Sequence, residues 1–223
     1  MLFNRNTIER SEWSQMNEQR PAWRVNSGML SRLTGTFRAQ PHQSIAADSF
    51  DSVPVSEIID FPQMRNEIFL SCSNAFRLQQ PISVLAIAVD EFGTFERNYG
   101  KDASTKAIQF IESTICHHRN LIFGKDSQCF IGRYVDNRYL MVLPGLSGSV
   151  ACEFAEYILR AVSTSEFVWN FRPLCFTVSI GISHKPGHNG DQDMLIMLAD
   201  QVCDQLMQSG GNRTATAKTT TNF

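Results

Sequence analysis

The sequence predicts an α+β sandwich of the palm or ferredoxin-like kind, in which helices pack on a central, mostly antiparallel sheet. Residues 83–89 are apolar on both alternating faces, as in a central strand buried on both sides. Two β-prone runs, 130–134 and 138–143, flank a three-residue turn and indicate a hairpin. The order helix, strand, helix, hairpin, helix, strand, helix therefore favours helices that cover one sheet.

Four apolar stripes with helical spacing predict the helices. The first helix ends near Leu78, because Pro81 cannot continue it. His117 and His118 end the second, where cationic side chains suit the carbonyl end of the helix dipole. Residues 174–183 form a further strand between the third and fourth helices. The stripes are Met64, Ile68, Cys72 and Phe76; Ala107, Ile108, Ile111 and Ile115; Ala151, Phe154, Ala155, Ile158 and Val162; and Leu195, Leu198, Val202 and Leu206.

These patterns place the folded domain at residues 56–212. Residues 1–55 are polar, and their few large apolar side chains hold no helical period, which is typical of a loosely ordered arm. The first forty residues contain six Arg and three Glu, a net charge of +3. We interpret the arm as solvated, with binding of a partner, nucleic acid or anionic lipid as the alternative. Residues 213–223 are expected to be a disordered, Thr-rich tail.

Composition and charge exclude several broad classes of function. The chain has 223 residues, and its 20 Lys and Arg against 22 Asp and Glu give a net charge of −2, so it is not a strongly basic nucleic-acid binder. No apolar run approaches the roughly 20 residues of a membrane-spanning helix. The N-terminus lacks the apolar stretch of a secretory signal, so we expect a cytoplasmic protein. The six Cys form no C-x-x-C motif and are expected to be buried free thiols.

Three further segments form a pattern through their order and spacing. Val84 to Phe92 is a strand that runs into Ala-Val-Asp-Glu-Phe, Gly132 to Tyr139 reads Gly-Arg-Tyr-Val-Asp-Asn-Arg-Tyr, and Val178 to Ser183 reads Val-Ser-Ile-Gly-Ile-Ser. Shorter matches lie at Tyr99-Gly100, Leu198-Ala199-Asp200 and Ser209-Gly210-Gly211-Asn212. Over about residues 58–212, the chain resembles the GGDEF domain, the catalytic domain of bacterial diguanylate cyclases.

The resemblance implies a fold whose active members join two GTP molecules into cyclic di-GMP. Those members bind two divalent cations through acidic residues, because hard cations prefer oxygen ligands. This chain carries a methyl group, a neutral amide and a guanidinium at the matching positions, and the guanidinium would repel a metal ion. The two signature glycines, which let the backbone approach phosphates, are replaced as well. The metal and signature positions fall on Ala88, Val135, Asp136, Asn137, Arg138 and Tyr139.

The other functional positions implied by the resemblance are also substituted. The family reads guanine with an Asn and an Asp, contacts phosphate with a Lys and an Arg, and is inhibited by its product at an Arg-x-x-Asp motif. The counterparts are Glu96 and Thr105 for guanine, Met207 and Gly211 for phosphate, and Asp126 and Cys129 for the ends of the inhibitory motif. No inhibitory site for cyclic di-GMP is therefore expected.

Among the acidic residues at the strand end, only Asp90 keeps the family's identity. One carboxylate cannot organise a two-metal site, so we interpret Asp90 as a turn or helix-capping residue. We expect Arg138 to form a salt bridge with Asp90 or Glu96. The alternative is that Arg133 or Arg138 contacts an anionic ligand.

These substitutions predict a degenerate GGDEF domain, catalytically inactive, that acts as a signalling or regulatory scaffold through protein contacts. The alternative is non-catalytic binding of a nucleotide or another anion in the former GTP cleft, and a third hypothesis is residual diguanylate cyclase activity. No cofactor is expected, since Mg²⁺ and GTP belong only to the third hypothesis. We expect a protein partner or a homodimer, without a membrane span and without nucleic acid.

Overall fold

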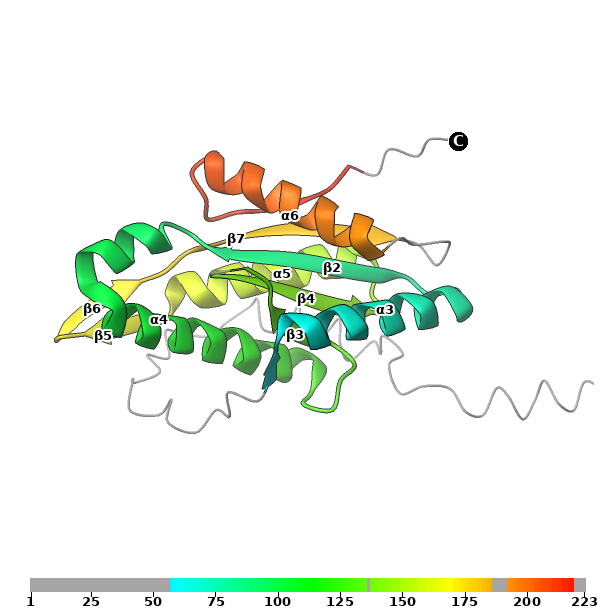
Figure 1. Ribbon diagram of the computed structural model, residues 1–223, viewed down its shortest axis with the longest axis horizontal. Helices are drawn as coiled ribbons and strands as arrows, with labels where there is room; N and C mark the ends of the chain where they lie inside the picture. The colour runs from blue at the N-terminus through cyan, green and yellow to red at the C-terminus, as the bar shows by residue number, and fades with distance from the viewer. Residues whose placement is uncertain (1–56, 136, 186–191, 219–223) are drawn as a thin grey trace, which may run out of the picture.

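The computed structural model describes residues 57–135, 137–185 and 192–218, and it confirms the α+β sandwich (Figure 1). The arm of residues 1–55 lies outside the described residues. Both strands of the expected hairpin and all four expected helices are present. The elements that match the sequence patterns are α3 (Phe61–Arg77), β2 (Ile82–Val89), α4 (Phe92–Phe123), β3 (Phe130–Arg133), β4 (Arg138–Pro144), α5 (Gly148–Thr164), β7 (Val178–Lys185) and α6 (Gln192–Gln208).

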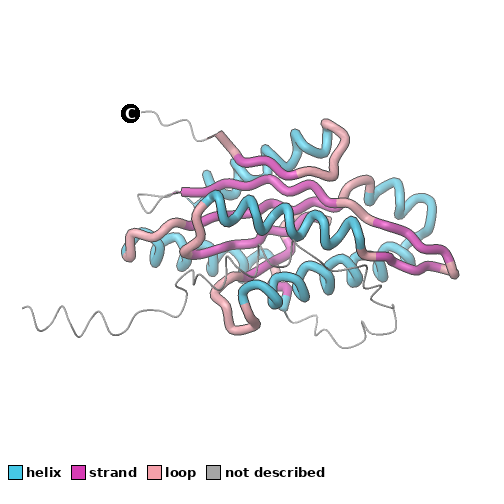
Figure 2. The backbone as a smooth tube through the Cα atoms, turned by 180° about the vertical axis from the view of Figure 1, so that it is seen from behind, coloured by secondary structure: helices cyan, strands magenta, loops and turns pink. Residues whose placement is uncertain are grey.

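The centre of the fold is a six-stranded sheet in the order β1-β3-β4-β2-β7-β8, where β1 is Ile58–Ile59 and β8 is Thr214–Thr216. β2 pairs antiparallel with β4 and β7, and all its residues are buried. Successive side chains of a strand point to opposite faces. Leu85 therefore packs in the core with α4 and α5, whereas Ala86 and Ala88 pack with α3 and α6 (Figures 1 and 2).

A glycine in β7 sets how closely α6 lies on the sheet. A Cβ atom at Gly181 would lie 2.1 Å from the carbonyl oxygen of Ala199 and 2.5 Å from the backbone nitrogen of Cys203, so no side chain fits there. Two residues further along β7, Ser183 Oγ donates a hydrogen bond to the carbonyl of Leu195 at 2.6 Å. The backbone of α6 thus packs directly against β7, which fixes the position of the helix over the sheet.

The single strand expected at residues 174–183 is wrong. Two strands occupy this part of the chain, because Phe176 and Thr177 separate β6 (Arg172–Cys175) from β7. β6 pairs antiparallel with β5 (Glu166–Trp169) in a separate hairpin that projects from one end of the molecule (Figure 2). Its two-residue turn places Asn170 and Phe171 at φ values of +49° and +62°, and Asn tolerates this region better than Phe does.

The expected end of the second helix is also wrong. α4 bends at Gly100, whose φ is +83°, and then continues to Phe123, so the two histidines lie within the helix. His118 Nδ1 lies 2.6 Å from the hydroxyl of Tyr157 on α5. Burial, together with the smaller effect of the neighbouring His117, lowers the pKa of His118 to about 4. A neutral ring that packs between two helices replaces the cation expected at a helix end.

Residues 213–217 continue the fold beyond residue 212, so the tail expected at residues 213–223 is wrong for this part, and residues 219–223 lie outside the described residues. β8 pairs parallel with β7, and the backbone nitrogen of Ala217 donates to the carbonyl of Ile182 at 2.7 Å. The segment is polar and rich in Thr, which makes it resemble a tail in the sequence. β-branched Thr also suits an edge strand. No helix in the described part of the chain is both long enough and apolar enough to cross a membrane.

Candidate functional site

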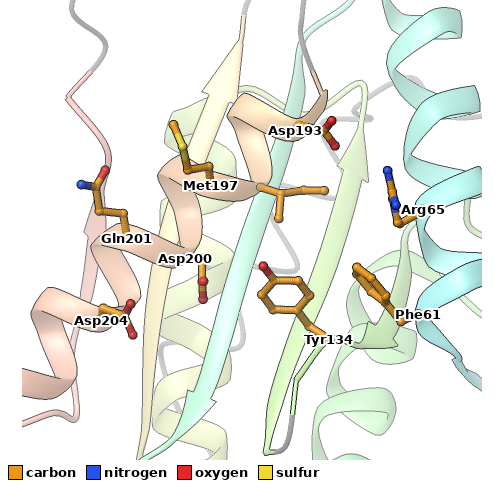
Figure 3. Close-up of a pocket in the computed structure, with 9 residues that line it drawn as sticks. Phe61, Arg65, Tyr134, Asp193, Met197, Asp200, Gln201 and Asp204 are labelled. Atoms are coloured by element: carbon orange, nitrogen blue, oxygen red, sulfur yellow. The ribbon is translucent and has the colours of Figure 1, made fainter.

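The site expected from the sequence lies where β2 ends and the β3–β4 hairpin turns, next to an open pocket between α3 and α6 (Figure 3). This pocket has a volume of about 660 Å³, and we call it the α3–α6 groove. Figure 3 shows residues of α6 along one side and residues of α3 along the other, with the hairpin residue Tyr134 between them. The lining residues are Phe61, Arg65, Tyr134, Asp193, Ile196, Met197, Asp200, Gln201 and Asp204.

Arg138, the first residue of β4, forms salt bridges with two carboxylates of α6. Its Nη1 donates to Asp200 Oδ1 at 2.8 Å, and its Nη2 donates to Asp204 Oδ1 at 2.5 Å. The expected salt bridge to Asp90 or Glu96 is therefore wrong. Burial alone would lower the pKa of Arg138, but its hydrogen bonds to the two aspartates raise it above the ordinary value. A fixed cation occupies this corner of the site and joins the hairpin to α6.

Asp90 is also held by neighbours within the chain. Its Oδ1 accepts a hydrogen bond from Ser179 Oγ at 2.7 Å, and its Oδ2 accepts from Thr177 Oγ1 and from the backbone nitrogen of Asn212, both at 2.8 Å. Asp90 lies in a turn, which is one of the two roles expected for it, and the N-cap of α4 is Glu91. The carboxylate ties the end of β2 to β7 and to the loop that follows α6.

The described residues around Asp90 do not fit a pair of divalent cations. Ala88 is fully buried and pairs with Arg138 across the sheet. Asn137 Nδ2 donates to the carbonyl of Val89 at 2.9 Å, which closes the turn against β2. Val135 is about half exposed, and Asp136 lies outside the described residues. A methyl group, an amide used in the turn and a paired guanidinium do not supply the oxygen ligands that Mg²⁺ requires.

The second arginine of the hairpin is paired as well. Arg133 Nε and Nη2 donate to the two carboxylate oxygens of Glu112 at 2.8 and 2.9 Å. The Tyr139 hydroxyl donates to Oε1 of the same carboxylate at 3.1 Å. Hydrogen bonding to Glu112 raises the pKa of Arg133, and burial raises the pKa of Tyr139. Arg133 thus joins the hairpin to α4 on the face of the sheet opposite α6.

The positions that the resemblance assigns to guanine are dispersed along α4. Glu96 lies before the bend at Gly100 and Thr105 lies after it, and both side chains are exposed. The Thr105 hydroxyl donates to the carbonyl of Lys101 at 3.0 Å, within its own helix. The two exposed side chains therefore lie on different segments of a bent helix.

The phosphate positions are apolar or closed. Met207 packs beside the core under α3 and α6. Gly211 has a φ of +68°, and a Cβ atom there would lie 2.7 Å from the Asp90 carboxylate, which three donors hold in place. A side chain such as the family's Arg does not fit this backbone without a shift in the loop.

The positions of the inhibitory motif lie between α4 and β3. Asp126 is exposed, whereas Cys129 is buried, and burial raises the pKa of its thiol to about 12. Cys72, Cys116 and Cys203 are buried too, but Cys152 is half-buried and Cys175 is exposed, so the expectation of buried thiols is correct for four of the six. Across residues 57–135, 137–185 and 192–218, no three His, Cys, Asp or Glu side chains are grouped to hold a metal ion.

Comparison with known proteins identifies the fold's family. The sequence profile described as "Diguanylate cyclase, GGDEF domain" matches residues 62–213. The chain belongs to the GGDEF family. It is 25% identical over 150 residues to the probable diguanylate cyclase DgcF of Escherichia coli K12, covering 66% of this chain and 46% of the relative. It is 23% identical over 140 residues to diguanylate cyclase A of Treponema denticola, covering 63% and 36%. The chain therefore spans less than half the length of these relatives.

Solved GGDEF domains share the fold. The active GGEEF domain of a diguanylate cyclase from Vibrio cholerae has a TM-score of 0.65 at 18% identity, with 73% of this chain and 99% of that chain covered. The FimX GGDEF domain from Pseudomonas aeruginosa has a TM-score of 0.62 at 16% identity, with 74% and 97% covered. The diguanylate cyclase SiaD of the same species, solved with its activator SiaC, has a TM-score of 0.66 at 15% identity, with 93% and 70% covered.

Sequence reasoning did not identify the carboxylates that pair with the two arginines of the hairpin, although Asp200 belongs to the Leu198-Ala199-Asp200 match. Asp200 and Asp204 lie 62 and 66 residues from Arg138 in the chain, and Glu112 lies 21 residues from Arg133. The only available signal was the four-residue spacing of the two aspartates, which places them on one face of a helix. That spacing does not say which strand the face covers.

Proposed function

We propose that this GGDEF domain does not make cyclic di-GMP and acts as a signalling or regulatory scaffold through protein contacts. The observation that carries the proposal is the position of Arg138, whose guanidinium is held by Asp200 and Asp204 where the resemblance puts a metal-binding acid. A paired arginine at this point opposes a divalent cation by charge and offers it no ligand.

The environment of Asp90 supports the same proposal. Its carboxylate already accepts three hydrogen bonds, from Thr177, Ser179 and Asn212, and these connect three separate segments of the fold. Recruiting it to a metal would require those donors to find other acceptors. A structural role therefore accounts for the one acidic residue that keeps the family's identity.

Cyclic di-GMP signalling in a bacterial cytoplasm is the setting that we propose for this scaffold. The GGDEF family supplies the link to cyclic di-GMP, and one relative of the same fold, SiaD, was solved in complex with its activator SiaC. A protein that binds a partner without turning over GTP could act in the same kind of pathway. The partner in this proposal is a protein or a second copy of the chain.

The test is product formation from GTP. Purified full-length protein is incubated with GTP and either Mg²⁺ or Mn²⁺, and cyclic di-GMP is separated by chromatography, with the active GGEEF domain from Vibrio cholerae as the positive control. We expect no cyclic di-GMP from this chain. Its accumulation above the no-enzyme control would overturn the proposal in favour of residual cyclase activity.

The alternative function is binding of a nucleotide or another anion without turnover. The α3–α6 groove favours it, because Arg65 lines an open pocket large enough for such a ligand. Arg133 and Arg138, the two expected anion contacts, are each paired with a carboxylate and would have to exchange partners. Calorimetry with GTP, GDP, ATP and cyclic di-GMP separates the two functions, since binding of any of the four would support the alternative.

A further inference from the structure

The α3–α6 groove is an apolar surface that the described residues leave open. Phe61 and Met197, from opposite walls, have exposed fractions of 36% and 56%. Tyr134 extends the apolar surface between them, with its ring centroid 5.4 Å from that of Phe61 (Figure 3). Large apolar side chains that gather around one concave site indicate a binding surface more strongly than scattered ones do.

The groove also carries an excess of negative charge. Asp193, Asp200 and Asp204 lie along α6 on one side of the groove, and Arg65 lies on α3 on the other side (Figure 3). Arg138 pairs with two of these aspartates, so three carboxylates stand against two guanidinium groups. The net charge of the groove is negative, and a segment that carries both apolar and cationic side chains complements it.

We propose that residues 1–40 of this chain bind in the α3–α6 groove. This segment has six Arg against three Glu, and it contains Trp13 and Trp23, two of the three tryptophans in the chain. Its excess positive charge matches the excess negative charge of the groove, and its tryptophans match the apolar surface around Met197.

The start of the described fold strengthens this assignment. The first described residue, Glu57, precedes Phe61 by only four positions, and Phe61 lines the groove. The segment is therefore tethered beside its site. Tethering over a short stretch of chain can raise the effective concentration to the millimolar range, so an intrinsic dissociation constant below that range is enough to keep the groove occupied.

This inference goes beyond the proposed function and is independent of it, because it concerns a contact within one chain. Occupation by residues 1–40 would make the groove unavailable to a second ligand until that ligand displaces the segment. A contact of this kind leaves a clear fluorescence signal, because the third tryptophan, Trp169, lies on β5 in the projecting hairpin and not in the groove.

The test places the fluorescent reporters on residues 1–40 alone. A Trp169→Phe change in the full-length chain leaves Trp13 and Trp23 as the only tryptophans. In this background we expect their emission to lie at shorter wavelength than in urea, and to be less accessible to acrylamide. Met197→Lys puts a positive charge on the apolar wall, where it opposes both the apolar contact and the attraction for the arginine-rich segment, and it should lower the ratio of bound to unbound segment by about tenfold, equivalent to about 1.4 kcal/mol.

Met194→Lys is the matched control. Met194 lies on the same helix with a similar exposed fraction, 49%, but it does not line the groove. A shift of the tryptophan emission to longer wavelength in Met197→Lys and not in Met194→Lys supports the proposal. Equal behaviour of the two variants, or parent emission equal to that in urea, overturns it.

Two further measurements keep the test decisive. If circular dichroism shows that Met197→Lys does not fold, Asp193→Lys serves in its place, because it reverses a charge in the lining of the groove. The same emission shift is expected, and its absence overturns the proposal. The emission should also be independent of protein concentration, since a dependence on concentration would assign the contact to a second copy of the chain.

Discussion

Replacement of Arg138 by Ala should destabilise the fold far more than loss of an ordinary surface ion pair. The guanidinium has two charge-assisted hydrogen bonds, and the exposed fractions of the side chains are 26% for Arg138, 23% for Asp200 and 45% for Asp204. We assign about 1.5 kcal/mol to the more sheltered bond and about 0.5 kcal/mol to the more exposed one. Repulsion between the remaining aspartates, four residues apart on α6, adds about 0.5 kcal/mol. The expected loss of unfolding free energy is therefore about 2.5 kcal/mol.

Thermal unfolding followed by circular dichroism measures this loss. For a chain of this size, about 2.5 kcal/mol corresponds to a fall in Tm of roughly 5–10 °C. Arg160→Ala is the matched control, because Arg160 forms an i,i+4 pair with Glu156 at 3.7 Å in which both side chains are more than half exposed. That control should change stability by about 0.5 kcal/mol.

Two further variants separate charge from packing. Arg138→Lys should recover about half of the loss, because one ammonium cannot form both bonds in the geometry of the guanidinium. Combining Arg138→Ala with Asp200→Asn and Asp204→Asn should recover the part that comes from repulsion. If Arg138→Ala and Arg160→Ala lie within about 0.5 kcal/mol of each other, the salt bridges do not hold the hairpin to α6 and our account of the site is wrong.

Four more predictions follow from single residues. Asp90→Ala should lower the free energy of unfolding by about 2–4 kcal/mol, since three donors lose their acceptor. Urea titrations with and without Mg²⁺ should give the same loss. A loss that appears only with Mg²⁺ would instead indicate that Asp90 is a metal ligand. Gly181→Ala should destabilise by about 3 kcal/mol or more, because its Cβ atom would meet the backbone of α6, and an unchanged Tm would contradict the packing described. Burial lowers the pKa of His118 from 6.5 to about 4, so the stabilising contribution of the neutral ring is complete above pH 6.5 and is lost as the pH falls toward 4. Urea titrations should therefore show that the free energy of unfolding is about 2–3 kcal/mol lower at pH 4 than at pH 7. This difference should be smaller in His118→Gln. Cys175 is the exposed thiol among the described cysteines, and iodoacetamide followed by peptide mass spectrometry should label it first, whereas labelling of Cys116, whose pKa burial raises to about 12, should require unfolding.

The parts of the fold that could be predicted from sequence are those with a strong local pattern. β2 is apolar on both faces, and its predicted bounds differ from the observed Ile82–Val89 by one residue. The stripe of α5 and the turn of the β3–β4 hairpin were likewise located correctly. In each case neighbouring residues determine the element, so its position can be derived without knowledge of the tertiary structure.

The errors arose where the deciding contact is distant in the chain or where the pattern is ambiguous. Residues 174–183 are largely apolar, so the break at Phe176 and Thr177 left no clear signal in the sequence. β8 is a short polar strand that forms only because β7 offers it an edge. The partners of Arg138 could not be identified from sequence, because they depend on the packing of α6 over β7 and β2, next to β4, and the close approach of that helix at Gly181 sets this position.

The central claim is that the acidic residues of this GGDEF domain stabilise its fold, and that the domain does not convert GTP into cyclic di-GMP. Phosphorus NMR tests it most directly, because one spectrum reports GTP, pyrophosphate and cyclic di-GMP together. Full-length protein at high concentration is followed with GTP and Mg²⁺, and then with Mn²⁺ in a quenched sample from which the metal is removed before recording. We predict that the GTP resonances keep their intensity throughout. Growth of pyrophosphate and cyclic di-GMP in step with loss of GTP would contradict the account.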